Sequence, residues 1–402
     1  MKLKLTIFFL FSVLTIFGQS PDGLKEILTI KSKIYNKERK IAVYLPPNYQ
    51  EVKNEKLQVV YVFDAQWEPI FNYVSNSISY LSAIGELNKM IVVGIYTENR
   101  PKEFVPMPTS EEEKKNWNEK PDFGFSALLD QHLIEEVFPL IKQKYNTNDY
   151  KLAIGHSLGG TYLLNSFAEN KHIFNSYIAI SPNLTYDENE IQKKIKRLIN
   201  SANEINSFLN ISVGDADKTE KSFTAGIRLL DTILQSKKVN GLKFKFDYLK
   251  DATHMSSPFK EIPLALIEFS KTLQQPNTEE ISTMLKNKKI LFSLQLKSYY
   301  QNISNWVGYS YLPYEGQLNS LAYSILDKNP DEGLSVINWA LELYPDGINL
   351  YDSKAEILEH LNRTQEAKET LKVGLQKLEK LKIDKSEYSN FKNILEKHLN
   401  KN

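Results

Sequence analysis

A serine flanked by glycines is the stretch of this chain whose residue types most directly suggest chemistry. Residues 150–164 read as a short apolar strand, a glycine turn and an apolar helix, and the turn carries Gly-x-Ser-x-Gly at residues 155–159. That pattern in that context predicts a nucleophile elbow, in which a strained turn holds the serine between neighbours without bulk. The helix that follows would direct backbone N–H groups and partial positive charge toward an oxyanion. Ser157 is therefore the predicted nucleophile.

A serine hydroxyl needs a base, and the base needs a carboxylate to orient it. The chain has six histidines, so the base can be found by elimination. His254 lies in a polar loop, after a predicted strand that ends at Leu249 and before the last helix of the same domain, and it is the predicted base. The other five lie inside the elbow, in or near the helices that flank it, or in the C-terminal part: His156, His132, His172, His360 and His398.

The orienting acid is expected between nucleophile and base in chain order, after the strand that precedes the histidine's strand. The stretch Gly214-Asp215-Ala216-Asp217 occupies that place. Asp217, three residues after the glycine, is the favoured acid. Asp215 is the second candidate, although aspartate in such a position often holds a turn instead. Glu220 is the third.

Two backbone N–H groups are expected to stabilise the oxyanion. One belongs to Leu158, directly after the nucleophile, and the other follows the predicted strand 57–63, where Ala65 or Gln66 would supply it. Asp64 is interpreted as a turn residue without a role in proton transfer.

Strands that alternate with helices must position these residues. This alternation predicts βαβ units and a mostly parallel sheet, preceded by two strands that pair antiparallel around a turn at 35–38. The long polar segment 96–125 is expected to be a loop. The expected strands are 27–32, 39–45, 57–63, 90–95, 151–154, 177–180, 208–214 and 242–249, and the expected helices are 68–88, 126–145, 191–202, 223–235 and 262–273.

After residues 274–277 the strand signals end, which predicts a domain boundary near residue 276 and a helical domain over 276–402. A 34-residue period in this part predicts at most two tetratricopeptide-like units, with a small helical bundle as the alternative. The period relates residues of similar size: Gly333 and Ala367, Ile337 and Leu371, Ala340 and Gly374.

The first residues have the composition of a targeting segment. Lys2 and Lys4 precede an apolar run over 5–17, and Gly18 suits a cleavage site before Gln19. This predicts a signal peptide over 1–18 and export, to the periplasm in a Gram-negative source, with an uncleaved anchor as the alternative. The hydrolytic domain would then span 19–275.

Composition excludes several other classes of function. The net charge of +1 argues against a general polyanion binder, and a chain with no cysteine cannot form disulfides or thiolate metal sites. A His-Glu-x-x-His pattern is absent, so we expect no metal and no cofactor.

Several stretches together resemble the esterase family within the α/β-hydrolases, which includes enterobactin and salmochelin esterases, S-formylglutathione hydrolase and feruloyl esterases. The resemblance covers roughly residues 25–273, and the siderophore-esterase branch is the most similar. One departure is Asp64-Ala65, where the family often has Asp-Gly. The similar stretches are 39–49, 61–65, 99–106, 155–160 and 174–182.

The resemblance implies an α/β-hydrolase fold followed by a small helical domain, and it implies that Arg100 binds a polar or anionic group of the substrate. A loop salt bridge is the alternative for Arg100. Trp67, which directly follows the oxyanion stretch, is the second candidate for substrate binding.

The leading hypothesis is a secreted serine ester hydrolase that works through a Ser-His-Asp triad and an acyl-enzyme, on siderophore-type or other bulky esters. One alternative is an interaction protein, in which the C-terminal helices bind a protein partner and the hydrolase domain is a weakly active scaffold. The other is an acyltransferase of the same fold. No nucleic-acid partner and no membrane span in the mature chain are expected.

Overall fold

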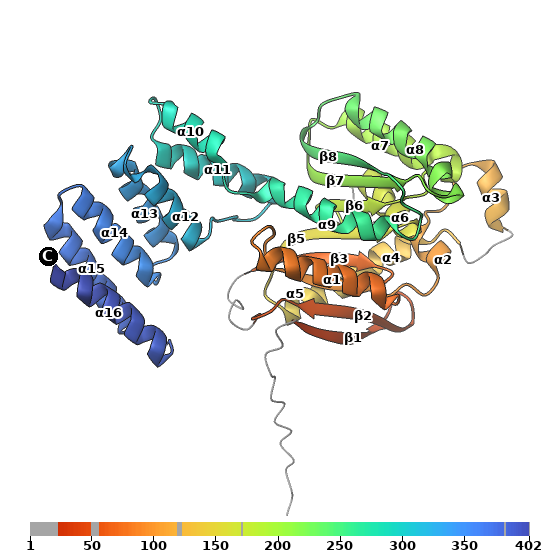
Figure 1. The fold of residues 1–402 in the computed structure, drawn as a ribbon. Helices are drawn as coiled ribbons and strands as arrows, with labels where there is room; N and C mark the ends of the chain where they lie inside the picture. The colour runs from red at the N-terminus through yellow and green to blue at the C-terminus, as the bar shows by residue number, and fades with distance from the viewer. Residues whose placement is uncertain (1–22, 50–55, 119–122, 170–171, 382, 402) are drawn as a thin grey trace, which may run out of the picture. The chain divides into compact units, whose positions relative to one another are not determined.

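The computed structural model describes residues 23–49, 56–118, 123–169, 172–381 and 383–401. The chain divides into two compact units, Met1–Ser270 and Lys271–Asn402, so the first ends slightly before the boundary predicted near 276. The first unit combines a sheet with helices, and the second is helical (Figure 1). The predicted signal peptide lies outside the described residues. Within the described ranges, no helix has both the length and the hydropathy needed to cross a membrane.

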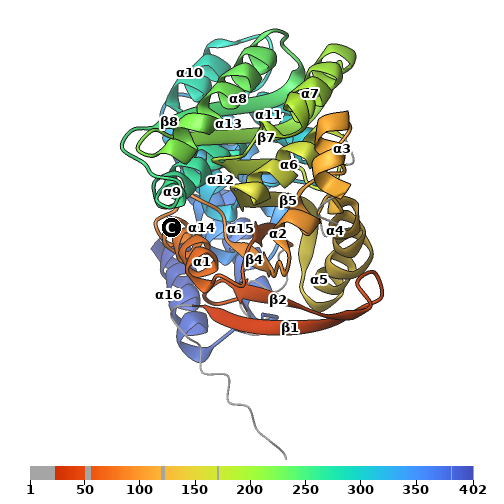
Figure 2. The same cartoon turned by 90° about the vertical axis from the view of Figure 1, so that its right-hand side faces the viewer.

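The first unit is built on an eight-stranded sheet with the order β1-β2-β4-β3-β5-β6-β7-β8. The pairs β1–β2 and β2–β4 are antiparallel and the other five pairs are parallel, which confirms the predicted mostly parallel sheet. Figure 2 shows β1 and β2 together at one edge. The strands are β1 Leu24–Ser32, β2 Lys37–Leu45, β3 Leu57–Phe63, β4 Met90–Ile95, β5 Thr147–His156, β6 Ser176–Ile180, β7 Glu204–Gly214 and β8 Asn240–Leu249.

Helices cover both faces of the sheet, which is why the central strands are continuous apolar runs. Every residue of β3 and of β4 is buried, as expected for parallel strands covered on both sides. On one face α1 packs beside α9, and on the other the apolar side chains of α4 to α8 join those of the strands. The helices are α1 Glu68–Ala83, α2 Arg100–Phe104, α3 Glu111–Asn118, α4 Ser126–His132, α5 Phe138–Lys144, α6 Leu158–Ala168, α7 Glu190–Ser201, α8 Lys218–Gln235 and α9 Ser257–Ser270.

The segment predicted as a long loop over 96–125 contains two short helices, α2 and α3. The side chain of Asn99 caps α2 by accepting a hydrogen bond from the Lys102 backbone N–H at 3.1 Å. The helix predicted over 126–145 is divided by a π-helical turn at Leu133–Val137. Pro139 follows that turn and has no N–H to continue the regular ladder.

Other helix ends also differ from the prediction. α8 begins at Lys218 rather than 223, and α9 at Ser257 rather than 262. The prediction missed both first turns because their residues show little apolar periodicity. α1 ends at Ala83 rather than 88, shortly before Gly85, whose φ of 80° is left-handed. The early start of α8 also decides which carboxylate can reach the site.

The second unit contains successive packed helix pairs. α13 and α15 begin at Pro330 and Thr364, which reproduces the 34-residue period. A Cβ added to Gly374 would lie 2.9 Å from the Cβ of Tyr351, so the small residue lets α15 approach α14 closely. The tetratricopeptide-like assignment stays a prediction. The helices are α10 Thr278–Lys286, α11 Phe292–Val307, α12 Glu315–Leu326, α13 Pro330–Leu343, α14 Ile348–His360, α15 Thr364–Leu378 and α16 Lys385–Lys401.

Candidate active site

Ser157 lies at a sharp turn between β5 and α6, as the motif predicted. Its φ of 58° and ψ of −123° are strained for a residue with a side chain, and its N–H donates to the Ile180 carbonyl oxygen at 2.9 Å. A Cβ at Gly155 would lie 2.6 Å from the carbonyl oxygen of Gly159. The motif therefore needs glycine because the strand and the helix approach too closely for any other residue.

Several residues with a strained backbone lie at the carboxyl ends of the strands. Non-glycine residues with positive φ follow the ends of four strands: Asp64 after β3, Ser157 after β5, Ser181 after β6 and Asp251 after β8. Each such residue costs on the order of 1–3 kcal/mol, which the surrounding structure must offset. The carboxyl ends of parallel strands are where sites form in α/β sheets.

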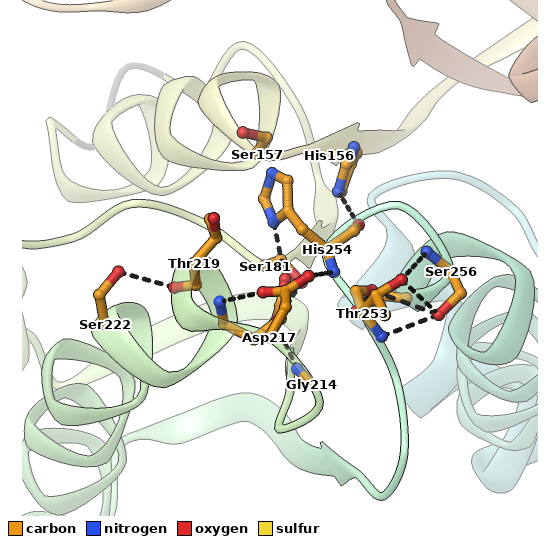
Figure 3. A network of polar contacts seen from close by, with 12 residues as sticks. His156, Ser157, Ser181, Gly214, Asp217, Thr219, Ser222, Thr253, His254 and Ser256 are labelled. Atoms are coloured by element: carbon orange, nitrogen blue, oxygen red, sulfur yellow. Dashed lines mark hydrogen bonds and ion pairs between the residues drawn. The ribbon is translucent and has the colours of Figure 1, made fainter.

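His254 lies in the loop between β8 and α9, and its ring is held by a carboxylate. Its Nδ1 is 2.6 Å from Oε1 of Glu220, which is completely buried. Figure 3 shows the opposite edge of the ring pointing toward Ser157. A serine, an imidazole and a buried carboxylate thus follow one another in the order of a catalytic triad.

The carboxylate on the ring is Glu220, and the prediction that Asp217 occupies this place is wrong. Asp217 is the N-cap of α8: its Oδ1 accepts from the Glu220 backbone N–H at 2.9 Å. Its Oδ2 accepts from the His254 backbone N–H at 2.7 Å (Figure 3). These two donors hold the pKa of Asp217 below its usual range. Asp215 instead accepts from the Asp251 backbone N–H at 2.7 Å, a contact with the loop after β8 and not with the His254 ring.

Glu220 is positioned by its own hydrogen bonds. Its Oε2 accepts from the Ser181 hydroxyl at 2.9 Å and from the Gly214 backbone N–H. A sequence signal for this arrangement existed, because Asp217-x-x-Glu220 has the spacing of a helix N-cap and the N3 position. A helix start at 218 assigns Asp217 to the cap and leaves Glu220 for the histidine.

The expected oxyanion donors are not equally available. Leu158 is the first residue of α6, so its N–H has no intrahelical partner. The Ala65 N–H donates to the Ile95 carbonyl oxygen at 3.0 Å, because the β3–β4 pairing continues beyond the strand end, and Ala65 is therefore a wrong prediction. The Gln66 backbone N–H has no acceptor among the described residues. Leu158 and Gln66 are the pair that remains.

Arg100 is used in the structure to join two strand ends. Its Nε lies 3.0 and 3.1 Å from the two carboxylate oxygens of Asp64, and its Nη2 donates to the His156 carbonyl oxygen at 3.3 Å. The buried ion pair of Arg39 with Glu103, 2.5 Å between Nη2 and Oε2, anchors α2 and with it Arg100. The geometry is that of the alternative interpretation, a loop salt bridge, although the Arg100 side chain is 38% exposed.

Exposed apolar side chains occur close in sequence to the oxyanion stretch and to the base. Trp67, the N-cap of α1, is 43% exposed, Met255 is 60% exposed and Phe259, in the first turn of α9, is 68% exposed. The Phe259 ring stacks on Tyr73 of α1 with a centroid distance of 5.4 Å. α1 and α9 thus present solvent-facing aromatic surface.

The chain matches the family described as "Putative esterase" over residues 32–235, just over half of its 402 residues. The chain belongs to this family of ester hydrolases. The matched region contains Ser157 and Glu220, and His254 follows it.

Individual proteins with similar sequence or structure agree with the fold. The chain is 26% identical over 180 residues to the ferri-bacillibactin esterase BesA of Bacillus subtilis, a match that covers 41% of this chain but only 61% of that relative. An IroE-like serine hydrolase from Shewanella oneidensis is 17% identical with a TM-score of 0.62, covering 80% of this chain and 100% of its own. An uncharacterised protein from Capnocytophaga ochracea is 17% identical with a TM-score of 0.67, covering 94% and 100%. The predicted α/β-hydrolase fold with a helical C-terminal part is confirmed.

Proposed function

We propose that this chain hydrolyses carboxylic esters through Ser157, His254 and Glu220. The observation that carries the proposal is the 2.6 Å contact between the His254 ring and a buried carboxylate, with the strained serine on the other side of the ring. Family membership supports the same chemistry.

The reaction follows from the positions of these atoms. Nε2 of His254 takes the proton from the Ser157 hydroxyl as its oxygen attacks the ester carbonyl carbon, and Glu220 stabilises the imidazolium through Nδ1–H. The tetrahedral oxyanion accepts from the N–H groups of Leu158 and Gln66. When the intermediate collapses, the C–O bond to the leaving alcohol breaks and His254 returns the proton to that alcohol. Water then attacks the acyl-enzyme by the same route and releases the acid and Ser157.

Bulky esters are the proposed substrates. The exposed side chains of Trp67, Met255 and Phe259 can contact large apolar or aromatic groups near the oxyanion stretch and the base. The relative BesA is named a ferri-bacillibactin esterase, which supports a siderophore-type ester. Arg100 would contact a polar or anionic group with the part of its guanidinium that stays exposed. We also propose that the segment 1–18 is a signal sequence that exports the enzyme.

The first test is Ser157→Ala, which removes the attacking oxygen alone. We expect hydrolysis of aryl esters to fall by about a million-fold, because loss of a serine nucleophile has that cost, and labelling by a fluorophosphonate probe to cease. A hydrolysis screen of the wild-type chain against aryl esters, feruloyl esters and catecholate trilactones would identify the substrate class.

The matched control is Ser166→Ala, a buried serine in the same helix α6, which should keep both hydrolysis and labelling. If Ser157→Ala keeps more than about one hundredth of the activity, the nucleophile assignment fails. A wild-type chain that neither hydrolyses these esters nor reacts with the probe would instead favour the alternative of a protein-binding scaffold.

A further inference from the structure

His156, the residue before the nucleophile, contacts the catalytic loop but has no part in the triad. Its Nε2 lies 2.8 Å from the main-chain carbonyl oxygen of His254, and the two imidazole rings are 4.6 Å apart between centroids at an angle of 40°. Figure 3 shows His156 reaching the His254 backbone from the Ser157 side. One turn therefore carries both the nucleophile and a contact to the base.

Three side chains, from the end of β5 and the N-terminal turn of α8, hold three different groups of His254. Glu220 holds the ring at Nδ1, and Asp217 accepts from the backbone N–H at 2.7 Å. His156 completes the set by donating to the backbone carbonyl oxygen. The peptide groups on both sides of the base are thus fixed, one from the N-cap of α8 and one from the end of β5. The β5 contact is the one that fixes the base relative to Ser157 itself.

His156 can serve in this position because its imidazole is uncharged near neutral pH. Burial, and then the proximity of His254, lowers the pKa of His156 to about 4. A neutral imidazole must carry its proton on Nε2 to donate to the carbonyl oxygen. It therefore adds no positive charge beside the imidazolium that forms on His254, where Arg100 and Glu220 are the other charged groups nearby.

We propose that His156 is a positioning residue, which ties the nucleophile elbow to the loop of the catalytic base and sets the distance between Ser157 and His254. The inference rests on the proposed function. A purely structural role would predict that substitutions alter stability without altering turnover of the folded enzyme.

The test compares three substitutions that differ in where they place a donor. His156→Gln extends an amide N–H to about the position of Nε2, His156→Asn carries the same amide on a shorter side chain that falls short of it, and His156→Leu has no donor. The control is His132→Gln, a buried histidine of α4 that contacts Glu136 at 2.6 Å, away from the triad. For each folded variant, kcat and KM on an aryl ester and the rate of fluorophosphonate labelling are measured beside the thermal midpoint.

We expect His156→Leu and His156→Asn to lower kcat and the labelling rate together by about 10–100-fold with KM within about twofold, the cost of a misplaced catalytic group. His156→Gln should recover kcat to within about fivefold of wild type, since one hydrogen bond is replaced by a similar one. The proposal is overturned if folded His156→Leu keeps full kcat, or, where the leucine variant does not fold, if the glutamine and asparagine variants have equal kcat. Activity that survives Ser157→Ala would instead reject the proposed function, so the two failures are distinguishable.

Discussion

Glu220 and Asp217 lie three residues apart at the start of α8. Each contacts a different part of His254, although the sequence alone suggested a single acid. Glu220 is buried and meets the imidazole ring, whereas Asp217 is at the helix terminus and meets only backbone N–H groups. Orientation of the base depends on the carboxylate that contacts the ring, because it selects the tautomer and stabilises the imidazolium. The two carboxylates should therefore respond differently to amide substitution.

We predict that Glu220→Gln lowers kcat by about 10³–10⁴-fold, since the amide cannot stabilise the charged imidazole. Asp217→Asn keeps an oxygen for the helix cap but loses one of its two acceptors, so it should cost about fivefold, the value of one hydrogen bond. Steady-state kinetics of both variants on one aryl ester make the comparison. Equal losses, or a greater loss in Asp217→Asn, would return the role of the acid to Asp217.

The sequence was sufficient where the chemistry and the local geometry coincide. The Gly-x-Ser-x-Gly pattern predicts a tight turn at Ser157, which the structure has because a side chain at Gly155 would collide with Gly159, and elimination selected His254, whose ring points toward Ser157. The sequence was insufficient where hydrogen bonds between distant segments determine which groups are available. Ala65 is excluded as an oxyanion donor by a hydrogen bond to Ile95, thirty residues away, and the sequence does not show that the β3–β4 ladder extends so far.

Among the elements, α9 buries a carboxyl group against the sheet. Glu261 is completely buried, beside the side chains of Asp247 and Asn210. Burial raises the pKa of Glu261 from 4.5 to about 8, assisted by Asp247 of β8, while Asn210 of β7 and Lys245 of β8 oppose the shift. The group is therefore protonated at neutral pH, and the folded state holds a proton that the unfolded chain releases.

This arrangement predicts how stability depends on pH. Because the folded-state pKa is raised, the stability of the first unit should fall as pH rises from about 4.5 to about 8. Glu261→Gln mimics the protonated form and should remove this loss, so that its advantage over wild type is about 1 kcal/mol or less at pH 5 and on the order of 4 kcal/mol at pH 8. Thermal midpoints at the two pH values measure it. Glu268→Gln, on the same helix but partly exposed, is the control, and an equal advantage at both pH values would contradict the assignment.

At the scale of the whole molecule, the residues proposed for catalysis all belong to the first unit. Ser157, Glu220 and His254 precede Ser270, where that unit ends. A compact unit with its own core is expected to fold by itself. The 34-residue period predicted the spacing of α13 and α15, but two copies cannot show whether the helices form repeats or a bundle, because that depends on packing with flanking helices that share no period.

We predict that a chain ending after Gln275 keeps kcat/KM on a small aryl ester to within about threefold of the full chain, as expected for an intact domain. The measurement is the rate of hydrolysis per labelled active site, together with the thermal midpoint. An insoluble or inactive product would mean that the second unit completes the core of the first, and the boundary near 276 would have to be withdrawn.

The position of β8 at the edge of the sheet has a consequence for how the enzyme is switched on and lost. Among the described strands β8 pairs with β7 alone, and the loop after it carries His254, the proposed base, whereas β5, which leads to Ser157, lies between β3 and β6. Edge elements open locally at lower free energy than central ones. Detachment of a single strand would therefore silence turnover while the nucleophile stays in place. During synthesis β5 is made before β8, because the chain emerges from its N-terminus. The residues of the elbow are made long before those of β8, so the proposed nucleophile should stay inactive until β8 pairs with β7.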